Sequence, residues 1–153
     1  MKVKFKKAIL SDIQHLQELI LPEVLAGVIL QRDDDEIATN IRSYILAYNN
    51  EKLIGFCALH IHTSNLAEIR SLVVKESVRG NRVGEQLVTQ AILEARELKL
   101  KKVLSLTYQK SFFEKLGFIE ISKESIPEHK IWTDCIKCKH FPVCNEVSLI
   151  KTL

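Results

Sequence analysis

The chain has 153 residues, 46% of them hydrophobic, which is enough for one domain with its own core and short for two. Its formal charge of +3 comes from 22 basic and 19 acidic residues spread along the sequence, a balance that does not favour nucleic acid as a partner. No targeting segment is visible, and the most apolar stretch, residues 19–30, is shorter than the roughly 20 residues of a membrane span. We therefore expect a single domain over residues 1–153, no membrane partner and a cytoplasmic location.

The first half of the sequence predicts strands and two helices. Residues 2–9 alternate lysines with apolar side chains, as a half-exposed edge strand does. Ser11 or Asp12 can cap a helix that follows. Apolar side chains at helical spacing, with three aspartates at the N-terminal end, predict a second helix over residues 33–47. Strands are expected over residues 53–61 and 66–74.

The second half centres on one long helix. A broad apolar face with a period of 3.6 predicts this helix from Val83 to Leu98. It is followed by a strand over residues 102–107, a short helix over 111–116, a strand over 118–121 and a last strand over 147–152. The order predicts a mixed α/β layer arrangement with β-hairpins at the start and one βαβ crossover.

The segment before the long helix is the most informative one. It is Arg79-Gly80-Asn81-Arg82-Val83-Gly84, between a strand and a helix. Glycines let the backbone approach a ligand closely, and the free N–H groups of a helix start attract a phosphate. The segment therefore favours a phosphorylated cofactor, and an ordinary strand-to-helix turn is the alternative.

This segment resembles the pyrophosphate loop of the GNAT superfamily of acyl-CoA-dependent N-acyltransferases, Arg/Gln-x-x-Gly-x-Gly/Ala. Residues 111–118, a short helix ending in Gly-Phe, resemble the closing segment of that family. Arg82 replaces the middle glycine; it still supplies an N–H but adds bulk and a charge that could contact phosphate. The resemblance implies an α/β (α+β) GNAT fold, with a mixed, mostly antiparallel central sheet flanked by helices, and acetyl-CoA as cosubstrate. The implied cofactor-binding residues are Leu72, Val73, Val74, Arg79, Gly80, Asn81, Arg82, Val83, Gly84 and Phe112.

A narrower resemblance concerns residues 67–74, 106–108, 129–132 and 135–146. They resemble the short single-domain amino-acid N-acetyltransferases related to N-acetylglutamate synthase. This implies transfer of acetyl to the α-amine of an amino acid, L-glutamate first, which begins arginine biosynthesis. Another amine acceptor, a non-catalytic acyl-CoA sensor and a homodimer remain open.

The reaction needs a base that takes a proton from the amine. Glu68 matches the acid of the glutamate-acetylating family and is the candidate base; the alternative is a solvent-facing acid paired with Arg70 or a lysine. Strict alternation puts Glu68, Arg70 and Leu72 on one face of the strand and Ile69 and Ser71 on the other. A β-bulge is therefore needed for both Glu68 and Ser71 to line the site.

The departing thiolate needs a proton, and many relatives supply it from a tyrosine that is here Phe113. Thr107 matches the hydroxyl residue of the glutamate branch, and Tyr108 is close by. Alternatively no protein acid is needed, because a thiol with a pKa of about 8.5 can leave as an anion.

The carboxylates of an amino-acid substrate call for fixed cations. By resemblance, Arg32 and Arg70 are the best placed, with Ser71 and Lys130 as further substrate-binding candidates. Arg32 could instead pair with the aspartates at positions 33–35.

The cysteines near the C-terminus form a separate cluster. Cys135, Cys138 and Cys144, with His140, could hold a structural zinc ion, although a second close pair of ligands is missing. The alternative is a thiol-rich surface loop that is reduced in the cytosol. Cys57, within an apolar strand, is expected in the core.

Overall fold

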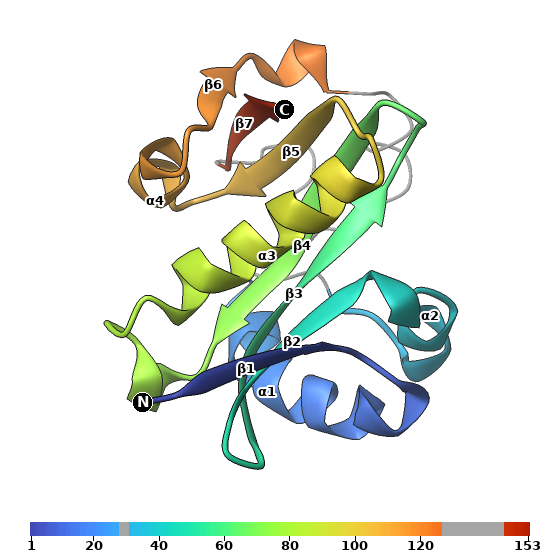
Figure 1. The fold of residues 1–153 in the computed structure, drawn as a ribbon, viewed down its shortest axis with the longest axis vertical. Coiled ribbons are helices and arrows are strands. Elements are labelled where there is room, and N and C mark those ends of the chain that lie inside the picture. Colours follow the sequence, from blue (N-terminus) through green and yellow to red (C-terminus); the bar gives the residue numbers. More distant parts are fainter. Residues whose placement is uncertain (28–30, 127–145) are drawn as a thin grey trace.

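A seven-stranded sheet forms the centre of the computed structural model, which describes residues 1–27, 31–126 and 146–153 (Figure 1). The strand order is β1-β2-β3-β4-β5-β7-β6, in which only the β4–β5 pair is parallel. The predicted mixed, mostly antiparallel sheet is therefore confirmed. The strands are β1 (Val3–Lys7), β2 (Tyr44–Asn49), β3 (Lys52–Ile61), β4 (Leu66–Val74), β5 (Lys102–Thr107), β6 (Ile119–Ile121) and β7 (Val147–Thr152).

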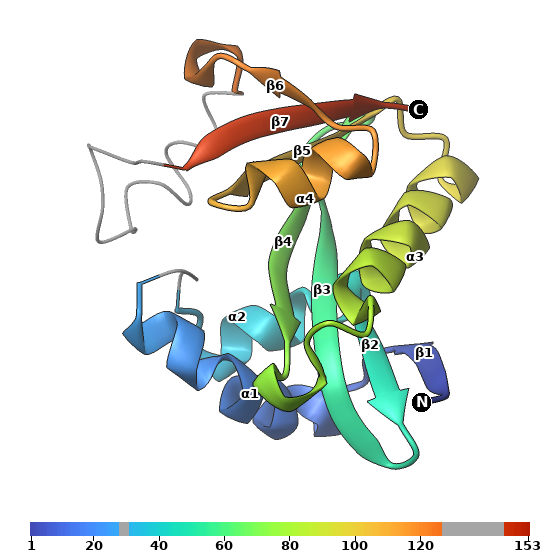
Figure 2. The same ribbon diagram turned by 90° about the vertical axis from the view of Figure 1, so that its left-hand side faces the viewer.

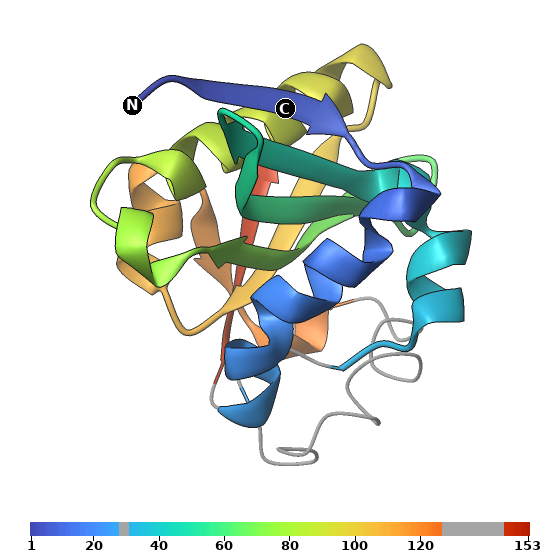
Figure 3. The ribbon, with the colours of Figure 1, turned by 90° about the horizontal axis from the view of Figure 1, so that it is seen from below.

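Helices cover both faces of the sheet. The long helix α3 (Val83–Glu97) lies across one face, whereas α1 (Ile13–Leu25) and α2 (Asp34–Thr39) lie on the other (Figure 3). The side chains of α3 and of α4 (Lys110–Lys115) share one core, and those of α1 and α2 share a second. None of the helices in the described ranges is long and apolar enough to cross a bilayer. Short 3-10 turns are η1 (Leu10–Asp12), η2 (Ile41–Ser43), η3 (Glu76–Val78) and η4 (Lys123–Ser125).

The predicted helix over residues 33–47 is wrong in its second half. The helix α2 ends at Thr39, and the chain from Tyr44 onwards forms β2, between β1 and β3. Residues 44–47 are all buried because the two helical layers cover both faces of the sheet here. A strand buried on both faces is apolar throughout, so its sequence also satisfies the spacing of a helix.

The starts of α1 and α2 differ in their capping. Asp33 caps α2, and its carboxylate accepts from the Glu36 N–H at 2.8 Å. Asp12 immediately precedes α1, as predicted, but its carboxylate accepts from the Ile9 N–H at 2.8 Å instead of from the helix. The predicted edge strand is confirmed as β1, which pairs only with β2 among the described strands.

Candidate active site

A cleft opens where the two parallel strands separate. Residues 66–69 of β4 pair with residues 102–105 of β5, and beyond them the strands part (Figure 2). The space between the strand ends, the start of α3 and α4 is a cleft of about 720 Å³. All the predicted cofactor-binding residues except Asn81 line it. The Asn81 side chain instead donates to the Val78 carbonyl at 2.9 Å, which holds the loop.

A β-bulge in β4 brings side chains from both faces towards this cleft. The register with β3 slips by one residue, since 56 pairs with 73 but 58 pairs with 70. Ser71 takes up the extra residue with a φ of 53° and lines the cleft. The bulge that the sequence required is therefore present. It also corrects the predicted face of Leu72, which now packs with Ile69 on the α3 side instead of with Glu68 and Arg70.

The loop before α3 presents an uncapped helix start to the cleft. Arg82 adopts the left-handed conformation (φ 62°, ψ 22°) immediately before the helix, and no side chain of the described residues caps this end. The first N–H groups of an α-helix lack partners within the helix, and the helix dipole makes this end positive. Gly80 has a φ of +90°, and Gly84 lies against the Phe112 ring. This arrangement suits a phosphate group.

Arg79 links the loop to α1 at the exposed rim of the cleft. Its Nε donates to the Val74 carbonyl at 3.3 Å, and its Nη2 forms an ion pair with Glu23 Oε1 at 2.9 Å. Glu23 lies on α1 and also lines the cleft. The guanidinium is therefore held between β4 and α1.

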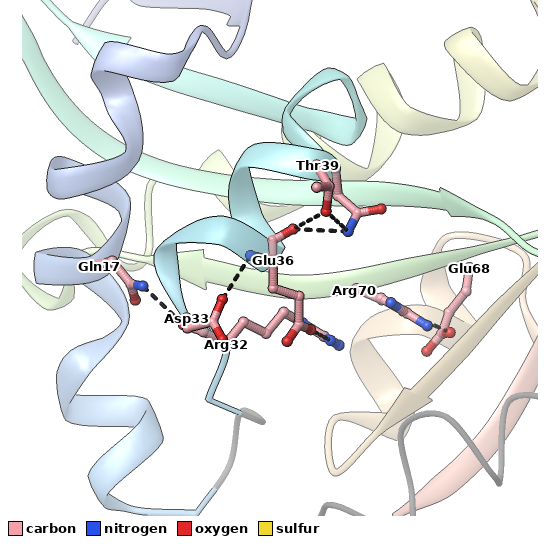
Figure 4. Close-up of polar contacts among 8 residues, drawn as sticks. Gln17, Arg32, Asp33, Glu36, Thr39, Glu68 and Arg70 are labelled. Atoms are coloured by element: carbon pink, nitrogen blue, oxygen red, sulfur yellow. Dashed lines mark hydrogen bonds and ion pairs between the residues drawn. The ribbon is translucent and has the colours of Figure 1, made fainter.

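Glu68 lies on the opposite face of β4 from Ile69 and is only 3% exposed. Its Oε1 accepts from Arg70 Nε at 3.2 Å (Figure 4) and lies 2.8 Å from His62 Nε2. The alternative of a solvent-facing acid is therefore wrong, although the pairing with Arg70 is present. Sequence reasoning missed His62 and His60. The available signal was their two-residue spacing at the end of β3, which puts both side chains on one face. In the structure His60 is the register partner of Glu68.

The two predicted substrate arginines approach the same cavity, whose volume of about 10 Å³ is that of roughly one water molecule. Arg32, from the loop before α2, and Arg70, from β4, line it together with Tyr44 and His60. Figure 4 shows both guanidinium groups reaching into one region beside Glu68. Burial raises the pKa of the Tyr44 phenol, and the positive charges of Arg32 and Arg70 oppose that rise. Both guanidinium groups therefore interact electrostatically with the phenol.

Contacts hold both the guanidinium and the backbone carbonyl of Arg32. Its Nη1 pairs with Glu36 Oε2 at 2.6 Å, one position beyond the aspartates that the sequence offered as partners. The Gln17 side-chain amide of α1 donates to the Arg32 carbonyl at 2.9 Å. These contacts hold the guanidinium at the cavity.

The hydroxyl candidates lie at the end of β5. Thr107 and Tyr108 both line the cleft, and Thr107 Oγ1 accepts from the Gln109 N–H at 2.8 Å. Phe113, which replaces the tyrosine of many relatives, is 3% exposed and lies edge-on to Phe112 and Phe118. It acts as a core residue.

The remaining candidates concern residues 127–145, which lie outside the described ranges. They are Lys130 and the cluster of Cys135, Cys138, His140 and Cys144. In the described part of the chain, no group of three His, Cys, Asp or Glu side chains could hold a metal ion. Cys57 is fully buried, and burial raises the pKa of its thiol to about 12, which fits a core residue.

Sequence comparison identifies the family. A family model described as the acetyltransferase (GNAT) family matches residues 12–118. An uncharacterized N-acetyltransferase of Chlorobaculum tepidum is 35% identical over 148 residues, which are 97% of this chain and 95% of that protein. An amino-acid acetyltransferase of Mycobacterium tuberculosis is 29% identical over 120 residues, 76% of this chain and 68% of that protein.

Structural comparison concerns the fold. The N-acetylglutamate synthase of Neisseria gonorrhoeae, solved with coenzyme A and N-acetyl-glutamate, superposes with a TM-score of 0.88 at 24% identity. The match covers 100% of this chain but only 35% of the synthase, and at this identity it shows the fold. Because the family model covers more than half of the sequence and the Chlorobaculum relative nearly all of it, the chain belongs to the acetyltransferase (GNAT) family.

Proposed function

We propose that this protein transfers the acetyl group of acetyl-CoA to the α-amine of an amino acid, with L-glutamate as the acceptor. The observation that carries the proposal is the meeting of two sites at residues 69–71 of β4. The cleft with the uncapped helix start lies on one side, and the buried carboxylate with the arginine-lined cavity lies on the other. The amino-acid acetyltransferase and the synthase among the similar proteins support the choice of acceptor.

The cleft fits a CoA thioester. The pyrophosphate would accept from the N–H groups at the start of α3, and a side-chain-free Gly80, with nothing within 4 Å of a Cβ position, leaves room for it. The pantetheine arm would lie along residues 72–74 of β4, whose neighbour β5 has moved away, and would add to the sheet as a peptide strand does. Phe112 borders this path.

Arginines line the cavity and carboxylates pair with them beside it, so charges of both signs lie close together, which suits an amino acid. Arg32 and Arg70 would face the substrate carboxylates, and arginine is the side chain best suited to bind them. Glu68 and Glu36 each already pair with one of these arginines, so the acceptor's ammonium would also meet negative charge. A dicarboxylic amino acid such as glutamate matches this alternation of charge.

The proposed chemistry uses the groups near these two sites. Glu68 accepts a proton from the ammonium, and the neutral amine attacks the thioester carbonyl carbon. The oxyanion would be stabilised by a backbone N–H near Leu72, beside the bulge. The nitrogen releases its second proton to the solvent as the carbonyl re-forms and the C–S bond breaks, and the CoA thiolate leaves either as an anion or with a proton from Thr107 or Tyr108, which line the cleft. The product would be N-acetylglutamate, the first intermediate of arginine biosynthesis.

The test is CoA release from acetyl-CoA with single amino acids as acceptors. We expect turnover with glutamate that falls by roughly a hundredfold or more in Glu68→Gln, since a general base typically contributes this much. The control is Glu120→Gln, on β6 at the far edge of the sheet, where the carboxylate is exposed and pairs with Lys110. Glu120→Gln should retain wild-type turnover.

Other outcomes would change the proposal in defined ways. Turnover with a different amine, and none with glutamate, would show that glutamate is not the acceptor and that the protein does not act in arginine synthesis. CoA binding without turnover of any acceptor would favour the acyl-CoA sensor. Wild-type turnover by Glu68→Gln would show that Glu68 is not the base.

A further inference from the structure

The buried histidine beside Glu68 has no part in the reaction as described so far. We propose that His62 is a positioning residue for Glu68: the neutral imidazole holds the carboxylate ready for the substrate's proton, and the imidazolium weakens it as a proton acceptor. This inference rests on the proposed function.

The contact is short and shielded from water. His62 Nε2 lies 2.8 Å from Glu68 Oε1, and the two side chains are 0% and 4% exposed. Arg70 Nε donates to the same oxygen at 3.2 Å. A buried carboxylate is costly without hydrogen-bond donors, and two donors on one oxygen also fix the orientation of the group. The position of the His62 imidazole therefore helps to fix the orientation of the Glu68 carboxylate.

The main chain and the ring of His62 each have a contact of their own. The backbone N–H of His62 donates to the Leu66 carbonyl at 2.9 Å, which fixes the main chain where β3 turns towards β4. The His60 ring lies edge-on to the His62 ring, with a centroid separation of 4.8 Å. The turn therefore fixes the main chain of His62, and the His60 ring limits how its imidazole can turn.

The charge state of His62 sets the strength of the base. Arg70 already balances the carboxylate charge of Glu68, and a neutral imidazole adds a hydrogen bond without adding charge. An imidazolium would add a second positive charge, which favours the carboxylate over its protonated form and opposes uptake of the substrate's proton. Histidine is the side chain that ordinarily changes charge between pH 5 and 8. The titratable and charged groups around this site in the described ranges are His60 on β3, Glu68 and Arg70 on β4, Tyr44 on β2, Arg32 before α2 and Glu36 on α2.

Two substitutions separate orientation from charge. His62→Gln keeps an N–H donor that never becomes charged, whereas His62→Leu removes the donor. We expect His62→Leu to lower kcat by roughly 10- to 100-fold with an unchanged KM for acetyl-CoA. At pH 8, His62→Gln should retain kcat within about fivefold of the wild type. As the pH is lowered from about 8 to 5.5, the kcat ratio of His62→Gln to wild type should rise.

The control is His15→Gln on α1, whose side chain is exposed, and its ratio to wild type should stay flat across the pH range. Each variant is first checked by thermal unfolding, and if His62→Leu does not fold, the pH profile of His62→Gln decides alone. Parallel profiles for His62→Gln and wild type, or a wild-type kcat in His62→Leu, would overturn the inference while leaving the proposed function intact. Absence of wild-type turnover with any amine would overturn the function itself.

Discussion

Substituting Arg82 separates the backbone effect of this residue from its charge. Arg82 holds a left-handed conformation at the start of α3, and its exposed side chain lines the cleft. A non-glycine residue in this conformation costs roughly 1–2 kcal/mol, and glycine's greater freedom in the unfolded chain offsets about 0.5–1 kcal/mol of that. Arg82→Gly should therefore raise the free energy of unfolding by about 0.5–1 kcal/mol, and Tm by about 1–4 °C for a chain of this length. Arg82→Ala keeps the strained backbone and should not raise Tm.

Both variants remove the same guanidinium from the cleft. If the exposed guanidinium contacts a phosphate of CoA, its removal weakens the free energy of CoA binding by about 0.5–1 kcal/mol. This corresponds to a two- to fivefold higher Kd. The loss should shrink as salt is added, because salt screens exposed charges. Thermal unfolding and calorimetric CoA titrations at two ionic strengths measure both effects. The reasoning is refuted if Arg82→Gly melts below Arg82→Ala, or if Arg82→Gly binds CoA more tightly than the wild type, which would mean that the arginine obstructs the loop.

Two further substitutions test contacts around the cleft and the closing turn. Glu23→Gln should tighten CoA binding by roughly two- to fivefold at low salt, because the Glu23 carboxylate competes with phosphate for Arg79 at 2.9 Å; weaker binding in calorimetry would show that Glu23 orients Arg79 instead. Gly117→Ala should destabilise the fold by roughly 1–3 kcal/mol in urea unfolding. Gly117 has a φ of +91°, and a Cβ there would meet the Lys151 ammonium that donates to the Leu116 carbonyl at 3.0 Å, so an unchanged midpoint would contradict this account.

Short sequence patterns predict much of this fold. The bounds of β4, β5 and β7 match the sequence prediction, because each strand is a short apolar run between polar or turn-forming residues. The loop from Arg79 to Gly84 stands out by its glycines and its place between strand and helix, and all of it except Asn81 lines the cleft. These features depend on neighbours in the sequence, which is why the sequence alone reveals them.

The predictions that were wrong or missing depend on contacts between segments far apart in the sequence. Whether Tyr44 belongs to a helix or a strand depends on burial by two helical layers, which the spacing of apolar residues does not report. Leu72 changed face because the register with β3 slips at Ser71. His62 became visible as a partner of Glu68 only once β3 and β4 were aligned, although both residues stand in the sequence.

The short ladder between β4 and β5 also bears on how the protein unfolds. Among the described strands, the part formed by β1–β4 pairs with the part formed by β5, β7 and β6 through residues 66–69 and 102–105. A molecule in the cleft touches both parts, so its binding energy adds to the cohesion between them. At a hundred times its dissociation constant, such a ligand contributes about 2.7 kcal/mol to stability. The resistance of the two parts to separate unfolding therefore depends on the concentration of the molecule that fills the cleft.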